Sequence, residues 1–390
     1  MKKQIIHPLP LLTLSALLIA GCNSQTSSQN NTRNTDNHSN NIATLEISNP
    51  SDFSRQQQNL FLPFSDLGIT ATQATHLVAY NNGNLIPSQL IDHNSDGTAD
   101  SLLVQLDMAA AVKQQISIRN DQIAFNSQNW PKLTQAEISI KNGGQWQGAK
   151  YIGGTFENVT EVTPPSQYTD HSEWIRYEGP GLESDKVGYR FYLDWRNGFD
   201  IFGNKTGKPV LHQVGLDGYK SYHQMADWGM DLLKVGKSLG AGAYGYWNGQ
   251  QAELVSKVGQ HTAKVIENGS LYSAIQIQYQ DWQVANKTLN LTANLAMTAG
   301  SRLVHTRVKL SEPLDNLAIG LVKLPDTKLI QGSVDITGHA WTYVATWGNQ
   351  SLAGKDDKLG MALLFKRGTR KQQTEDANSH VSVMSLAGTE

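Results

Sequence analysis

The residues best suited to chemistry lie in the stretch 187–245. A strand-like alternation places Arg190, Tyr192 and Asp194 on one face, with about 7 Å between successive side chains. A guanidinium fork can hold a carboxylate through two hydrogen bonds, and neutralising that carboxylate acidifies the carbon next to it. Arg190 is therefore a candidate for binding the carboxylate of a uronic acid. The alternative is a structural ion pair with Asp194 or Glu183.

A Tyr222-His223 pair follows in a loop-like stretch rich in Tyr and Gly. An imidazole titrates near neutral pH and moves protons readily, and a phenol can donate one. Together with Arg190, these groups suit β-elimination from a uronic acid. His223 would take the proton, and Tyr192 or Tyr222 would protonate the departing oxygen. The alternative is a histidine whose ring only satisfies nearby backbone.

Four further residues are expected to contact the substrate. Trp228 and Asp227 would shape a sugar subsite, and Lys234 and His305 would add polar contacts. A pair of carboxylates could instead support glycoside hydrolysis, with Asp227 or Asp231 as the candidates. The sequence contains no HExxH, GxSxG, Walker or dinucleotide-binding glycine motif, so we expect no organic cofactor.

Oxygen-bearing side chains alternate in one acidic loop. Asp92, Asn94, Asp96 and Asp100, with the carbonyl of Thr98, could hold a structural calcium ion. The alternative is an Asx-rich turn that needs no ion.

The N-terminus has the form of a lipoprotein signal peptide over residues 1–22, with a charged start, an apolar run and a lipobox ending in Cys22. Lipidation of this only cysteine would anchor the protein to a membrane, and Asn23 favours the outer membrane, with the protein facing the periplasm or the cell surface. Residues 23–43 contain almost no apolar side chain and are expected to form a disordered tether.

Most of the remaining sequence has the pattern of short strands, which predicts an all-β protein. We expect a small β-sandwich-like domain over residues 44–125, a connector over 126–144 and a large antiparallel two-sheet sandwich over 145–390. The best helix candidate is 222–235. The segment 379–390 shows no obvious closing strand, which suggests a missing C-terminal piece.

The composition limits the classes of molecule that the protein is expected to bind. Net charge is −2 and no basic cluster occurs, which argues against nucleic acid. Nine tryptophans and thirteen tyrosines suit a protein that handles sugars, because flat rings stack on sugar rings.

Three segments together resemble a bacterial family long described as a domain of unknown function: VGYRFYLDWRNGFDIFG, YHQMADWGMDLLKVGKSLGAGAYG and PSQLIDHNSDGTADSLL. Its members are typically secreted proteins or lipoproteins from polysaccharide-utilisation loci, and they include an ulvan oligosaccharide dehydratase. The resemblance implies a sandwich of galactose-mutarotase type after a small β domain. It places Tyr222 and His223 in the family's YH pair, and Arg190 and Tyr192 in its YRFYLD strand.

These observations predict a carbohydrate-active lipoprotein that performs β-elimination, as a dehydratase or lyase, on uronic-acid-containing oligosaccharides. Two alternatives stay open. One is a glycan-binding lipoprotein without turnover, and the other is the hydrolase described above.

Overall fold

The computed structural model describes residues 41–390 except 95, 337, 338 and 387. The signal peptide with Cys22, and residues 23–40 of the expected tether, lie outside this range. The first strand, β1, begins at Asn41, three residues before the expected domain start.

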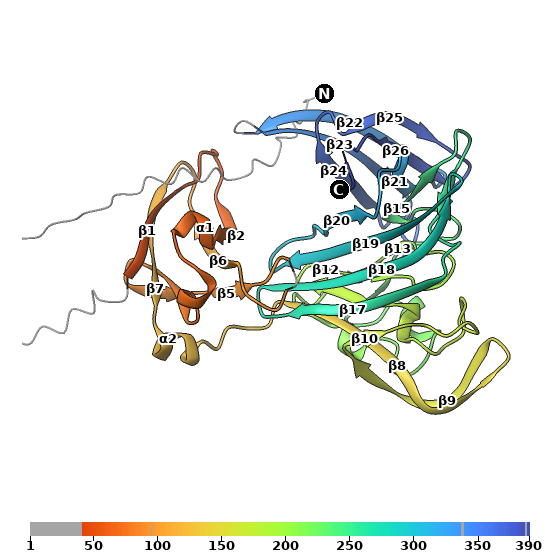
Figure 1. The fold of residues 1–390 in the computed structure, drawn as a ribbon, viewed down its shortest axis with the longest axis horizontal. Coiled ribbons are helices and arrows are strands. Elements are labelled where there is room, and N and C mark those ends of the chain that lie inside the picture. Colours follow the sequence, from red (N-terminus) through yellow and green to blue (C-terminus); the bar gives the residue numbers. More distant parts are fainter. Residues whose placement is uncertain (1–40, 95, 337–338, 387) are drawn as a thin grey trace, which may run out of the picture. The chain divides into compact units, whose positions relative to one another are not determined.

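The expected all-β architecture is confirmed, with antiparallel sheets throughout the described residues (Figure 1). The chain divides into two compact units, Met1–Pro131 and Lys132–Glu390. The boundary falls inside the expected connector, but most of that connector is a strand. β8 occupies Thr134–Gln147 and pairs with β11 and β9. Alternating side chains such as Ala136 and Ile138 are buried, so packing favours a strand there.

Unit 1 is a small β-sandwich. One sheet has the order β1-β7-β3-β4 and the other β2-β6-β5, and apolar side chains of both form one core. Its elements are β1 (Asn41–Ser48), β2 (Arg55–Pro63), α1 (Phe64–Leu67), η2 (Ala71–Gln73), β3 (Leu77–Asn81), β4 (Asn84–Ile86), β5 (Ser88–Ile91), β6 (Ser101–Met108), β7 (Lys113–Asn120) and α2 (Gln122–Ser127).

The acidic loop connects β5 to β6. Its side-chain oxygens accept hydrogen bonds from its own backbone: Gly97 N to Asp92 Oδ2 (2.7 Å), Asp96 N to Asn94 Oδ1 (2.9 Å) and Thr98 N to Asp96 Oδ1 (2.8 Å). Asp100 instead pairs with His93, Oδ1 to Nδ1, at 2.9 Å. Among the described residues, no group of three or more His, Cys, Asp or Glu side chains is placed to hold a metal ion. The loop geometry therefore fits an Asx-rich turn, and calcium binding stays a prediction.

Unit 2 contains four sheets, with the orders β14-β13-β12-β11-β8-β9, β10-β17-β18-β19-β20, β16-β15-β21-β26-β25 and β22-β23-β24. After β8, its strands up to residue 231 are β9 (Lys150–Val159), β10 (Glu161–Val162), β11 (Gly181–Ser184), β12 (Val187–Phe191), β13 (Phe199–Asn204) and β14 (Gly229–Asp231). The strands that follow are β15 (Ala241–Trp247), β16 (Ala252–Leu254), β17 (Gln260–Asn268), β18 (Tyr272–Val284), β19 (Lys287–Thr298), β20 (His305–Leu310), β21 (Leu317–Val322), β22 (Thr327–Ile336), β23 (His339–Gly348), β24 (Leu359–Lys366), β25 (Arg370–Glu375) and β26 (Ser379–Met384). Three short 3-10 turns, η3 (Arg176–Glu178), η4 (Leu211–Gln213) and η5 (Ser221–His223), lie in the connections.

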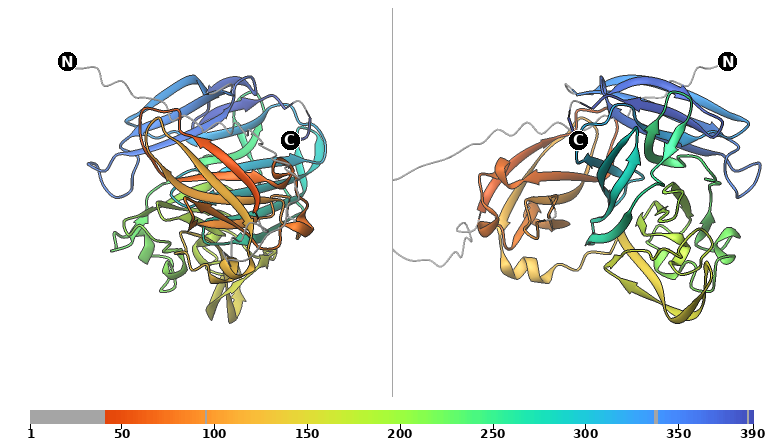
Figure 2. Two further views of the ribbon diagram at one scale, coloured as in Figure 1. Left: turned by 90° about the vertical axis from the view of Figure 1, so that its left-hand side faces the viewer. Right: turned by 45° about the vertical axis from the view of Figure 1, so that its right-hand side comes forward.

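One large apolar core runs through unit 2. It takes side chains from β11 and β12 of the six-stranded sheet and from β17, β18 and β19 of the five-stranded sheet beside it. The hairpin of β8 and β9 extends beyond this core as a long ribbon (Figures 1 and 2).

Two sequence expectations are corrected in unit 2. The segment 222–235 is not a helix, because its residues form the end of η5 and then β14. Gly229 there has φ 134°, which no helix contains. The C-terminal segment does hold a strand. Ser379–Met384 forms β26, which is fully buried between β21 and β25.

No helix in the described part of the chain is long and apolar enough to cross a membrane.

Candidate active site

The site is built on Arg190, which lies on β12 directly opposite Asp200 of β13. Arg190 Nε and Nη2 donate to Asp200 Oδ2 at 2.9 and 2.7 Å, and Nη2 also donates to Asp231 Oδ2 at 2.6 Å. All three residues are at most 2% exposed. A buried guanidinium with two carboxylates forms a network whose members depend on one another, because each would otherwise be an uncompensated charge.

Two tyrosines complete the surroundings of Arg190. Tyr192 donates its O–H to Asp200 Oδ2 at 2.7 Å, so Arg190 and Tyr192 meet at one carboxylate as expected. The strand is shorter than expected, because β12 ends at Phe191 and Asp194 pairs with Arg196. Arg190 Nη1 donates to the Tyr222 oxygen at 3.4 Å. The guanidinium carbon also lies 4.6 Å from the Tyr192 ring centroid and 5.4 Å from that of Tyr222. Arg190 is thus enclosed by its own protein partners.

A second buried ion pair lies beside the first. Arg196 binds Asp194, and its Nη2 lies 3.1 Å from Glu178 Oε1. Glu178 also faces Arg190, with Oε2 3.8 Å from Nη1, so one carboxylate links the two guanidinium groups. The expected pairing of Arg190 with Asp194 or Glu183 does not form. Glu183 instead accepts the backbone N–H groups of Val210 and Leu211 at 2.8 and 2.7 Å.

His223 sits at the edge of this network, at the end of η5, with its side chain 32% exposed. Its Nδ1 lies 2.9 Å from the Tyr219 carbonyl oxygen. A carbonyl can only accept, so Nδ1 carries the proton and Nε2 has the free lone pair in the neutral ring. Nε2 lies 3.5 Å from Asp231 Oδ2.

The electrostatic surroundings keep His223 neutral. Burial and the nearby charge of Arg190 lower the pKa of His223 below its usual value. Burial and the neighbouring Asp200 raise the pKa of Asp231 to about 7. A neutral imidazole with an unprotonated Nε2 is the form that a general base requires.

Tyr219 is the residue that sequence reasoning missed. Its ring lies between two imidazoles, with centroids 4.7 Å from His171 and 4.8 Å from His223. Its oxygen shares a hydrogen bond of 2.8 Å with His171 Nε2, and His171 Nδ1 lies 3.3 Å from Asp170 Oδ2. Burial and Glu178 raise the pKa of Tyr219 to about 12, so the phenol is protonated near neutral pH.

The segment that carries His171 has an unusual backbone. His171, Glu173, Tyr177 and Glu178 all have positive φ angles, of 58°, 62°, 39° and 68°. Such angles are costly for residues other than glycine and concentrate where function requires a fixed geometry. No sequence signal identified this segment, because strained backbone has no fixed residue pattern outside Gly and Asn.

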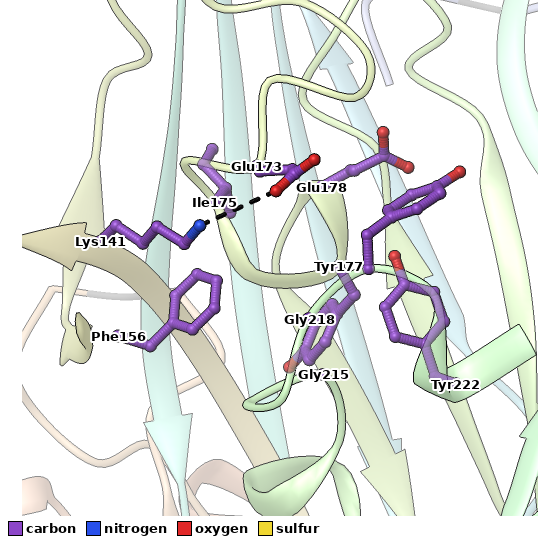
Figure 3. Close-up of a pocket in the computed structure, with 10 residues that line it drawn as sticks. Lys141, Phe156, Glu173, Ile175, Tyr177, Glu178, Gly215, Gly218 and Tyr222 are labelled. Atoms are coloured by element: carbon purple, nitrogen blue, oxygen red, sulfur yellow. Dashed lines mark ion pairs between the residues drawn. The ribbon is translucent and has the colours of Figure 1, made fainter. Parts of the chain in front are cut away.

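A small cavity lies next to Tyr222 of η5 and Tyr219, which precedes η5. It is lined by Lys141 and Phe156 of the β8–β9 hairpin, by Glu173 and Glu178, and by Tyr219 and Tyr222, among others (Figure 3). Figure 3 shows Lys141 and Phe156 on one side and Tyr222 on the other. Lys141 Nζ lies 3.9 Å from Glu173 Oε2 and 5.4 Å from the Phe156 ring centroid. The cavity thus joins a cation, an aromatic ring and phenols.

The structure brings His223, Tyr222, Arg190 and Tyr192 together, as expected. Trp228 packs near them, with its ring centroid 6.1 Å from that of Phe202, and Asp227 is exposed beside it. Lys234 is exposed beyond β14. His305 begins β20, which belongs to the other large sheet and not to the sheet that carries Arg190.

Fold and site together define an all-β protein in which a buried ion network supports an accessible cluster of histidine and tyrosine. The chain belongs to the family described as "Domain of unknown function (DUF4861)", whose profile matches residues 47–389. It is also similar to "Uncharacterized protein P7" of Formosa agariphila, with 21% identity over 287 residues. That match covers 73% of this chain and 65% of the relative, so the chain spans just under two thirds of the relative's length.

Proposed function

We propose that this protein is a carbohydrate-active enzyme that performs β-elimination, as a dehydratase or lyase, on oligosaccharides containing uronic acid. The observation that carries the proposal is the pairing of a neutral His223, unprotonated at Nε2, with the protonated phenol of Tyr219 beside it. A base and an acid of different pKa at one site are what an elimination requires.

His223 and Tyr219 carry out the two proton transfers of the proposed step. His223 Nε2 removes the proton from the carbon next to the uronate carboxylate. The electron pair of that C–H bond forms a C=C bond and expels the oxygen at the β position, which takes a proton from Tyr219. His171 then returns a proton to Tyr219 from solvent, since it is hydrogen-bonded to the phenol and 49% exposed.

The substrate carboxylate is assigned to Lys141 in place of Arg190. Arg190 is 2% exposed and held by Asp200 and Asp231, so it acts here as a positioning residue. Lys141 lines the cavity, where its Nζ makes a long ion pair with Glu173 and lies over the ring of Phe156. A cation at this position stabilises the enolate-like charge of the transition state.

Tyr219 replaces Tyr192 and Tyr222 as the proposed acid for a similar reason. Tyr192 and Tyr222 are 4% and 1% exposed, and their hydroxyl groups face Asp200 and Arg190. They shape the network that holds His223. Hydrolysis through Asp227 and Asp231 is less favoured, because the carboxylate of Asp231 is buried against Arg190.

The test is incubation with a panel of uronate-containing oligosaccharides, followed by ultraviolet absorbance and mass spectrometry. We expect a rising alkene signal, and a product lighter by one water when hydroxide is the leaving group. His223→Ala should lose this activity, whereas His76→Ala in unit 1 should keep it. New reducing ends without an alkene would assign hydrolysis, and full turnover by His223→Ala would remove the mechanism.

We also propose that the chain is an outer-membrane lipoprotein anchored through Cys22. Support comes from the lipobox that ends at this cysteine. Cys22→Ala should move the protein from the membrane fraction to the soluble fraction in a bacterial host, and unchanged fractionation would reject the anchor.

A further inference from the structure

In the sheet of β22, β23 and β24, one face of β23 and β24 packs on the core and the other faces solvent. Val344, Met361 and Phe365 lie on the inner face and are at most 7% exposed. Along β24 every second residue is exposed, in register with the outward residues of β23. This outward face is separate from the sheet that carries Arg190 and from η5, which carries His223.

Aromatic side chains form a row along the outward face of β23. Trp341, Tyr343 and Trp347 share this face because they are separated by even numbers of residues. Trp347 is 51% exposed. Tyr343 and Trp347 are four residues apart, which corresponds to about 14 Å along a strand.

Glycines on the flanking strands hold two of these rings flat. Gly332 of β22 pairs with Tyr343, and a Cβ at Gly332 would lie 2.5 Å from Tyr343 Cζ. Gly360 of β24 pairs with Trp347, and a Cβ there would lie 2.9 Å from Trp347 Cε3. Each ring thus covers a glycine on its neighbouring strand. One side of the ring packs on the sheet and the other side is turned outward.

Ala345 lies between Tyr343 and Trp347 and pairs with Ala362 of β24, so the space between the two rings is lined by small side chains on β23 and β24. On β22 the partner of Ala345 is Ile330, which adds an apolar side chain beside the row. A flat, rigid aromatic surface of this kind suits the C–H face of a sugar ring, because apolar contact is gained with little loss of side-chain freedom.

The charge on this face selects the class of sugar. Lys328 pairs with Trp347 at one end of the row, and Lys366 pairs with Trp341 at the other. Both lysines are exposed, and no outward-facing residue described on the three strands is acidic. Two cations at the ends of an apolar row complement a chain that carries carboxylates or sulfates along its length.

We propose that the outward face of β22–β24, defined by Trp341, Tyr343, Trp347, Lys328 and Lys366, is a non-catalytic binding surface for an extended acidic polysaccharide. It would hold a long chain on the protein independently of His223. This inference goes beyond the proposed elimination, since it needs no turnover.

The test is affinity electrophoresis of the His223→Ala protein in gels containing alginate, polygalacturonate or neutral hydroxyethyl cellulose. We expect retardation by the acidic polysaccharides. Trp347→Ala, Tyr343→Ala and the double variant Lys328→Ala/Lys366→Ala should each weaken binding about tenfold, equivalent to about 1.4 kcal/mol. Phe53→Ala in unit 1 and Lys264→Ala on β17 are matched controls and should bind unchanged.

The same substitutions in the otherwise natural chain should leave turnover of short oligosaccharides unaltered. Absence of elimination by the natural chain, with retained retardation, would reject the proposed elimination and keep this surface. Unchanged retardation of all three variants would overturn the surface. Equal retardation by the neutral polymer would overturn its selectivity for acidic chains. A dimer in sedimentation that Trp347→Ala dissociates would assign the face to a second copy of the chain.

Discussion

At the scale of single residues, the site depends on which groups are charged. Arg190 lies between two carboxylates and two phenols, and its positive charge disfavours a proton on His223. The same burial that lowers the pKa of this histidine raises the pKa of Tyr219. A neutral base and a protonated acid therefore coexist over a wide range of pH, which neither side chain would achieve alone in water.

This arrangement predicts a pH profile with one rising limb. His223 must be deprotonated to act, and its pKa is lowered, so kcat/KM should rise with an inflection below about 6.5, the usual histidine value. No falling limb should follow up to about pH 9, because Tyr219 loses its proton only near 12. Tyr219→Phe should lower kcat by about 100-fold or more. Steady-state kinetics between pH 5 and 9 measure both effects, with Tyr246→Phe as control, and a profile that falls between pH 7 and 9 would contradict this acid.

At the scale of elements, the glycines after β14 have structural roles that differ. Gly240 has φ 61° and touches β13, since a Cβ there would overlap the Phe199 carbonyl oxygen. Gly236 has nearly the same φ, 58°, but nothing lies within 4 Å of its would-be Cβ. The two glycines therefore differ in the approach of β13 and not in their backbone angle.

We therefore expect Gly240→Ala to destabilise unit 2 by more than Gly236→Ala. Strain in the left-handed region costs about 1–2 kcal/mol at either position. Gly240→Ala must also displace backbone, so its total loss should exceed about 3 kcal/mol. Urea denaturation of the two variants gives the comparison. Equal losses would show that the contact with Phe199 yields easily.

The acidic loop between β5 and β6 gives a second prediction at this scale. If the loop binds calcium, the ion should raise the melting temperature of unit 1 over that in a chelator, because a ligand that binds only the folded state stabilises it. Asp96→Asn should reduce this shift. An identical melting temperature with calcium and with chelator would leave the loop as an Asx turn, which its backbone hydrogen bonds already support.

At the scale of the whole molecule, two separate cores divide the chain. The core of unit 1 and the large core of unit 2 share no residue. We expect two unfolding transitions, since cooperativity follows the packed core. Val104→Ala in unit 1 removes buried methyl groups and should shift only one transition, by about 1–3 kcal/mol. Calorimetry of this variant is the measurement, and a single transition that moves as a whole would show that the units unfold together.

The sequence by itself determined most of the strands and the stretch in which the candidate site residues lie. Period-two alternation predicted the strands and placed Arg190 and Tyr192 on one face, because this pattern is a local property of the chain. The Tyr222-His223 pair was predicted to lie near Arg190. The sequence also predicted a small sandwich before residue 126. The expected helix over 222–235 failed because β14 is held by pairing with β13, which no local pattern reveals.

The tertiary structure decided which groups meet. Arg190 could have paired with Asp194 or Glu183 on sequence grounds, but strand register placed Asp200 opposite it and β14 brought Asp231 from 41 residues away. The bond between Tyr219 and His171 joins residues 48 positions apart. Contacts over such separations depend on how strands are ordered in a sheet. Residue types near one another in the sequence therefore defined a neighbourhood, and the packing of distant strands decided which of its side chains meet.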